Sequence, residues 1–242
     1  MDNKNGTTIW LFGRGLSCNC GLTWTVPESW RSLPRDEQIE RIKPAIRTEM
    51  NSPNVDISSI RRLLDDLAAK TPDGQKHRFG TTNWDYLLQR EILVRSHDAW
   101  DGIQPVWLAE SHVSHINGTA EELENNAHRS PFLLEEDAYD KRTKSVEADN
   151  FYNFMIGGWR FVVVGMSFEC EIDRFLLYSL GRVQDDLPIG ESTWLVVNRN
   201  YEALEKTRTA IADHLPRAKI VAVQSSFSDW QNNGYSGLWD MP

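Results

Sequence analysis

Short apolar runs alternate with longer amphipathic stretches along this chain of 242 residues. A continuous apolar run of four to eight residues is typical of a strand that is buried on both faces. The longer stretches repeat apolar residues at helical spacing, as Ile60, Leu63, Leu64 and Leu67 do. This pattern predicts strands over 8–12, 76–81, 106–110, 112–116, 160–165, 193–198 and 219–223. It predicts helices over 36–50, 56–70, 85–95, 135–156, 171–181 and 201–214.

Alternating strands and helices of this kind predict an α/β fold, with a Rossmann-like parallel sheet and helices on both faces. The length favours one domain over 1–242, with helical insertions at about 24–75 and 120–156. Residues 225–242 form a polar tail, which predicts a loop or a docking segment. In open parallel sheets, ligands bind at the carboxyl ends of the strands, near the point where the strand order reverses.

The composition is that of an ordinary globular protein, with 40% hydrophobic and 25% charged residues. No apolar run approaches the ~18 residues of a membrane span, and residues 1–8 are polar, so we expect a cytoplasmic protein with no membrane contact. The formal net charge of −9 disfavours nucleic acid as a partner. This charge does not exclude a dinucleotide ligand, because backbone N–H groups hold such ligands.

The three cysteines predict neither a disulfide framework nor a metal site. They are Cys18, Cys20 and Cys170. Their number is odd, and the one close pair has a single intervening residue where zinc modules have two to four.

A glycine-rich loop directly follows the first predicted strand. Gly13 and Gly15 let the backbone turn sharply and approach a pyrophosphate, and Arg14 and Ser17 lie in the same loop. The third glycine, Gly21, comes later than in the dehydrogenase fingerprint. A tight turn with no ligand explains the loop equally well.

Polar residues also follow the other predicted strands. Asn83 and Asp85 come after the strand at 76–81, where an amide suits a ribose hydroxyl or a carboxamide; capping of the next helix is the alternative. His115 and Asn117 would share a strand face, with His115 as a general base; a turn at Asn117 and Gly118 is the alternative.

Two further segments repeat this placement after a strand. Gly165 and Ser167 follow the clearest buried strand, and Asn198 ends the next one. Glycine permits close approach, and the Ser and Asn side chains can bond a ribose or a phosphate. Helix capping explains each of these segments equally well.

Taken in order, these segments resemble the sirtuin-like family between about residues 9 and 223. The family's loop G-A-G-x-S-x-x-x-G-[IL]-P is similar to 13–23, and its T-[QN]-N-[YIW]-D segment is similar to 82–85. Its H-G, G-[TY]-S and later Asn elements look like Asn117-Gly118, Gly165-Met166-Ser167 and Asn198. The resemblance implies that Asn83 contacts the nicotinamide ribose and positions water, and that Asp85 holds the carboxamide.

Three departures separate the chain from the protein deacetylases of that family. The zinc-ribbon cysteines are absent, which points to the bacterial branch that hydrolyses NAD in defence against phage. Arg14 replaces a small residue, and Thr23 stands where proline is usual. The catalytic His position holds Asn117, with His115 two residues earlier.

The resemblance therefore implies an NAD glycohydrolase that releases nicotinamide and ADP-ribose without a metal. Control would come from self-assembly into a homo-oligomer or from a separate sensor or activator protein. The alternative is a module that binds NAD or ADP-ribose in assembly or regulation without turning it over. A protein deacylase is the least favoured reading, because the zinc module is missing.

Overall fold

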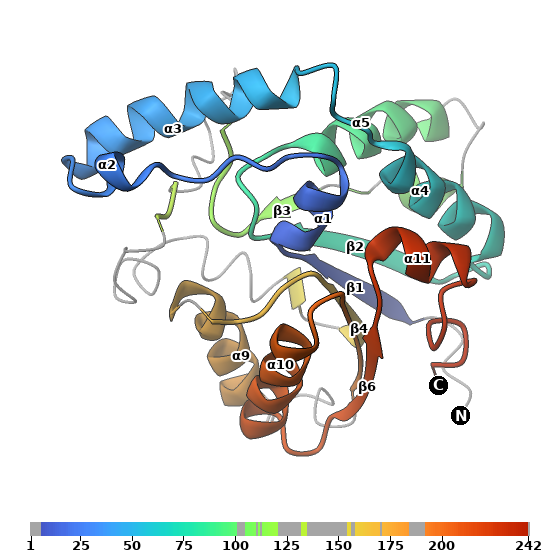
Figure 1. Cartoon of the computed structure of the whole chain (residues 1–242). Coiled ribbons are helices and arrows are strands. Elements are labelled where there is room, and N and C mark those ends of the chain that lie inside the picture. The colour runs from blue at the N-terminus through green and yellow to red at the C-terminus, as the bar shows by residue number, and fades with distance from the viewer. Residues whose placement is uncertain are drawn as a thin grey trace.

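Six parallel strands form one sheet in a computed structural model of the chain (Figure 1). The structure describes residues 6–100, 105–109, 111, 113–120, 132–134, 154–155, 158–169, 171–183 and 192–241. The strands are β1 (Thr7–Phe12), β2 (Lys76–Thr81), β3 (Val113–His115), β4 (Gly158–Val164), β5 (Thr193–Asn198) and β6 (Lys219–Gln224). The strand order β3-β2-β1-β4-β5-β6 is the Rossmann order, which confirms the predicted fold class.

Helices connect these strands and are placed largely where the periodicity predicts them. They are α1 (Arg14–Asn19), α2 (Glu28–Arg31), α3 (Arg35–Met50), α4 (Ser58–Lys70), α5 (Leu87–Trp100), α6 (Val106–Ala109), α9 (Glu171–Val183), α10 (Tyr201–His214) and α11 (Phe227–Asn232). Two segments differ from the prediction. Residues 106–109 form a helix instead of a strand, because a four-residue apolar run fits either one. The segment after 225, predicted as a loop or docking segment, contains the helix α11. Most of the helix predicted at 135–156 lies outside the described residues.

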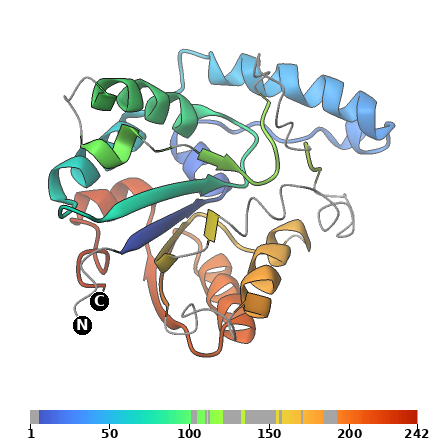
Figure 2. The same ribbon diagram turned by 180° about the vertical axis from the view of Figure 1, so that it is seen from behind.

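Alternation along β1 divides the core into two clusters, one on each face of the sheet. Trp10 and Phe12 belong to the cluster that also contains apolar residues of α3, α4, α5 and α11. Ile9 and Leu11 belong to the other cluster, with residues of α9 and α10. Figure 1 shows these two groups of helices on opposite sides of the sheet, and Figure 2 shows the same layers from behind. Among the described residues, no helix is long and apolar enough to cross a membrane.

The C-terminal segment packs against the sheet. Trp230 and Tyr235 are almost completely buried, and the Tyr235 hydroxyl donates to Asp66 of α4 over 2.8 Å. Gln231 donates to the carbonyl of Ser59 over 2.9 Å. These contacts hold residues 227–241 on the face of the sheet that carries Trp10.

A buried histidine, His77, makes the stability of this core depend on pH. The indole N–H of Trp10 donates to Nδ1 of His77 over 3.0 Å, and Nε2 lies 2.8 Å from the Thr71 hydroxyl. Since Nδ1 accepts, the neutral ring carries its proton on Nε2. Burial, with the positive charge of Arg160, lowers the pKa of His77 from 6.5 to about 3. Protonation in the folded state would break the bond from Trp10.

We therefore expect the free energy of unfolding to fall as the pH drops from 6.5 towards 3. A depressed folded pKa means that the unfolded chain takes up the proton first, so this contribution is complete above pH 6.5. One such group can change stability by up to about 1.4 kcal/mol per pH unit. Urea unfolding across this range should give a shallower slope for His77→Gln than for wild type or for His97→Gln, which removes an exposed histidine of α5. An unchanged slope in His77→Gln would contradict the assignment.

Candidate functional site

The glycine loop after β1 lies in direct backbone contact with the loop after β4. The Gly13 N–H donates to the Val164 carbonyl over 2.9 Å, and the Gly15 N–H donates to the Gly165 carbonyl over 3.0 Å. A β-carbon on Gly15 would lie 2.5 Å from the Gly165 α-carbon. Gly165 itself has φ +63°, where glycine is favoured. Glycine is therefore required here because two backbones touch.

A pocket of about 600 Å³ opens at the carboxyl ends of β1, β2 and β4. The order of the sheet reverses between β1 and β4, so this is the position where open parallel sheets bind ligands. Eight residues singled out from the sequence line it: Gly13, Arg14, Ser17, Asn83, Asp85, Asn117, Gly165 and Ser167. Gly15, His115 and Asn198 are not among its lining residues.

The segment after β2 lines the pocket and is hydrogen-bonded to the glycine loop. The Asn83 amide donates to the Gly13 carbonyl over 2.9 Å, and the Asn83 N–H donates to the Thr81 hydroxyl. Asp85 accepts from the Ser17 hydroxyl at 2.5 Å and from the Leu87 N–H at the start of α5. Burial raises the pKa of Asp85 above its usual range, although these hydrogen bonds oppose the rise. Asp85 thus meets the expected helix-capping role and also lines the pocket.

His115 and Asn117 do not share a face, so that prediction is wrong. β3 ends at His115, and a turn follows in which the Gly118 N–H donates to the His115 carbonyl and Gly118 has φ +83°. The His115 ring bonds to Gln89 of α5, and burial lowers its pKa to about 4. Strand alternation stops where the turn begins, so only Asn117 reaches the pocket. A general-base role for His115 in this pocket is not supported.

Asn198 contacts the loop that follows β4 and does not line the pocket. Its amide donates to the Met166 carbonyl over 3.4 Å, and its oxygen accepts from the Asn200 N–H over 3.0 Å. Met166 lies between the two pocket residues Gly165 and Ser167. Asn198 therefore contacts the loop after β4 and not the pocket itself.

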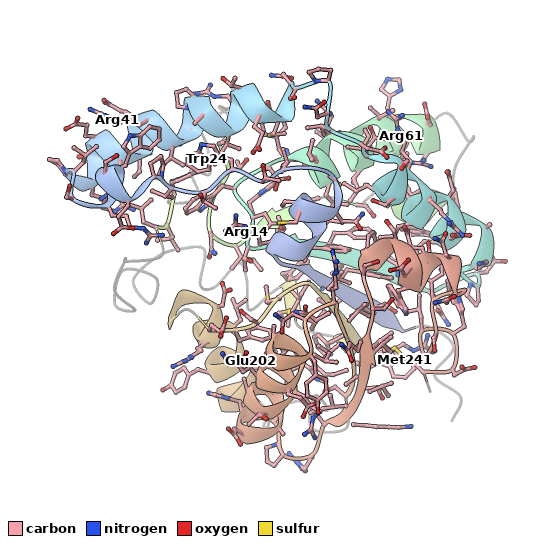
Figure 3. All side chains as sticks on the ribbon, viewed as in Figure 1. Arg14, Trp24, Arg41, Arg61, Glu202 and Met241 are labelled. Carbon is pink, nitrogen blue, oxygen red and sulfur yellow. The ribbon has the colours of Figure 1, made fainter. Side chains whose placement is uncertain are left out.

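The segment between α1 and α2, residues 22–26, lines one side of the pocket and was missed by sequence reasoning. Glu49, near the end of α3, accepts from the backbone N–H groups of Thr23 and Trp24 at 2.9 and 3.0 Å. The Arg14 guanidinium donates to the Trp24 carbonyl over 3.3 Å. Figure 3 labels Arg14 on the glycine loop and Trp24 on the segment that passes it.

Asp173 of α9 is another pocket residue that sequence reasoning missed. Its carboxylate accepts from the Asn117 amide over 3.5 Å, and the same amide donates to the Thr82 carbonyl over 3.2 Å. One sequence signal could have found it: Asp173 lies in the first turn of the helix that follows the loop containing Ser167. A first-turn acidic residue usually suggests only a favourable interaction with the helix dipole.

The described residues include no group of three or more His, Cys, Asp or Glu side chains that could hold a metal. Of the cysteines in the described part, Cys18 is exposed and Cys20 is buried, and both are free. Burial raises the pKa of the Cys20 thiol to about 12, so this thiol is inert near neutral pH.

Comparison with known proteins found structural similarity without a sequence match. No protein-family model and no curated protein sequence matches the chain. A structure from work on the mechanism and regulation of Sir2 enzymes is 12% identical, with 93% of this chain and 90% of that one covered at a TM-score of 0.47. Two from work on sirtuin substrate affinity are 11% and 13% identical, at TM-scores of 0.46 and 0.48. Their coverage is 95% and 94% of this chain, and 94% of each of the matched chains.

Proposed function

We propose that this chain binds NAD in the pocket at the reversal of strand order and hydrolyses its nicotinamide–ribose bond. One observation carries the proposal: residues chosen from four separate segments of the sequence converge on a single pocket. Those segments follow β1, β2, β3 and β4, and were chosen because each resembles a part of an NAD site. The pocket that they line lies at the carboxyl edge of the sheet beside the reversal of strand order, where open parallel sheets bind ligands.

The residues present suit a dinucleotide. The volume falls within the roughly 300–1,000 Å³ of small-molecule sites. The touching backbones at Gly13 and Gly165 leave no side chain between the two loops. Arg14 and Arg31 line the pocket as cations, which suits a pyrophosphate despite the acidic whole chain.

The reaction would depend more on the position of water relative to the ribose C1′ than on a strong acid or base. Breaking the bond between the ribose C1′ and the nicotinamide nitrogen sends the bonding electrons to the ring, and positive charge develops on the ribose. Asn83 lies on the pocket wall, where its amide group can orient water towards C1′. Water adds to C1′ and loses a proton, which yields ADP-ribose and free nicotinamide.

Incubation of purified protein with NAD, followed by chromatography, tests this function. We expect nicotinamide and ADP-ribose in equal amounts. A protein that binds ADP-ribose in calorimetry and releases no nicotinamide would favour the second candidate, a binding module. That candidate is favoured by Asn117, because a neutral amide cannot accept a proton near pH 7.

Hydrolysis of NAD would harm the cell that contains the protein, so the activity must be restrained at rest. We therefore propose control by homo-oligomer formation or by a separate sensor protein, and a role in bacterial defence against phage. In bacteria that express the chain, cellular NAD should fall after phage infection and stay constant before it. Equal NAD levels in expressing and non-expressing infected cells, across a phage panel, would contradict this role.

A further inference from the structure

The pocket contains a carboxylate, Asp173, beside Asn117, whose neutral amide cannot act as a base. Asp173 extends from the first turn of α9 to the pocket wall, where the Asn117 amide donates to its Oδ1 over 3.5 Å. The second contact of that amide, to the Thr82 carbonyl, fixes it against the end of β2. Asn117 therefore holds the Asp173 carboxylate next to the segment that carries Asn83.

The other carboxylates of the pocket have structural contacts. Glu49 accepts from the backbone N–H groups of Thr23 and Trp24. Asp85 accepts from the Ser17 hydroxyl and from the first turn of α5. Glu169 is exposed and pairs with Lys206 at 2.6 Å. Asp173 differs in that it accepts from a side-chain amide, that of Asn117, which also lines the pocket.

We propose that Asp173 is the catalytic base of the hydrolysis, an inference that rests on the proposed function. As the C1′–nitrogen bond breaks and its electrons pass to nicotinamide, the oxygen of a water forms a bond to C1′. The water proton moves to the Asp173 carboxylate, and then to solvent after ADP-ribose leaves. The negative carboxylate also stabilises the positive charge that develops on the ribose. Asn117 is a positioning residue, because its amide orients Asp173.

A carboxylate is sufficient for this step. The attacked carbon carries positive charge, so a water that bonds to it becomes strongly acidic and gives up its proton late. A positioned base in such a step typically contributes about 10²–10⁴-fold to the rate. With Asp173 as the base, hydrolysis does not require a base at residue 117, where the resemblance places a histidine and this chain has Asn117.

Asp173→Asn tests the role, because it keeps the size of the side chain and removes the ability to accept a proton. We expect nicotinamide release to fall about 10²–10⁴-fold, with the ADP-ribose affinity from calorimetry within about twofold of wild type. We expect nicotinamide release by wild type to fall at acid pH, and this fall should be absent in the variant. Asp173→Ala should be equally slow and should regain part of its rate in added formate, which can enter the vacated space and take the proton.

Glu202→Gln is the matched control, because it removes a carboxylate from the first turn of the neighbouring helix α10. Glu202 lies on α10 well away from Arg14 and Trp24, and does not line the pocket (Figure 3). Its rate and pH profile should equal those of wild type.

The possible failures are distinguishable. Active wild type with an equally active Asp173→Asn, or a pH profile shared by both, would overturn the role of Asp173 and leave the proposed function intact. Wild type that binds ADP-ribose and releases no nicotinamide would overturn the proposed hydrolysis and the base with it. Unfolding of both Asp173 variants, or an Asp173→Ala variant that formate does not rescue, would assign the residue a structural role and overturn the proposal.

Discussion

Gly15→Ala is expected to destabilise the folded chain by about 3 kcal/mol or more, a large part of the typical 5–15 kcal/mol of a domain. The added β-carbon would lie 2.5 Å from the Gly165 α-carbon, and both atoms belong to backbones that are hydrogen-bonded to each other. Neither loop can move without losing the bond between the Gly15 N–H and the Gly165 carbonyl. Urea unfolding measures the loss directly.

Gly234→Ala is the control for this prediction. Gly234 has φ +71°, yet nothing lies within 4 Å of its added β-carbon. It should cost only the about 1–2 kcal/mol of placing alanine in the left-handed region. If Gly15→Ala proved as stable as wild type and lost NAD affinity alone, Gly15 would face the ligand and the contact between the two loops would not be what requires glycine.

Asn83→Ala is expected to slow nicotinamide release by about 10²–10³-fold, as the loss of one preorganised polar contact typically does. The variant also loses the bond from its amide to the Gly13 carbonyl, which should lower stability by about 1 kcal/mol. ADP-ribose binding should persist, since that ligand lacks nicotinamide. Steady-state rates, calorimetry and thermal unfolding measure the three quantities.

Asn200→Ala is the matched asparagine control. Asn200 caps α10 by accepting from the Ala203 N–H over 3.1 Å, and it does not line the pocket. It should lose about 1 kcal/mol of stability and no activity. If Asn83→Ala behaved in the same way, Asn83 would be a structural residue only.

Sequence patterning predicted β1, β4 and β5 well because each of these strands contains a continuous apolar run. β2, β5 and α10 have the bounds that the pattern predicts. The pocket residues after the strands could be chosen for a related reason, since the carboxyl ends of parallel strands meet at one edge. Gly13, Asn83 and Gly165 needed no knowledge of helix packing to be placed there.

Residues that reach the pocket by tertiary packing could not be chosen in this way. Glu49 contacts the backbone of Trp24 only because α3 folds back beside residues 22–26, a path visible in Figure 1. Asp173 reaches Asn117 across 56 positions of sequence through the docking of α9. His115 failed as a candidate because β3 is short, and the strand alternation assumed for it ends one residue before the turn.

A crystal structure of Asn83→Ala with NAD tests the central claim most directly, because the slow variant should keep the dinucleotide intact. We predict the pyrophosphate beside Gly13 and Gly165, and the nicotinamide ribose beside position 83, with Asp173 facing C1′. NAD bound elsewhere on the chain, or a pocket that stays empty at saturating NAD while the protein is folded, would contradict the account.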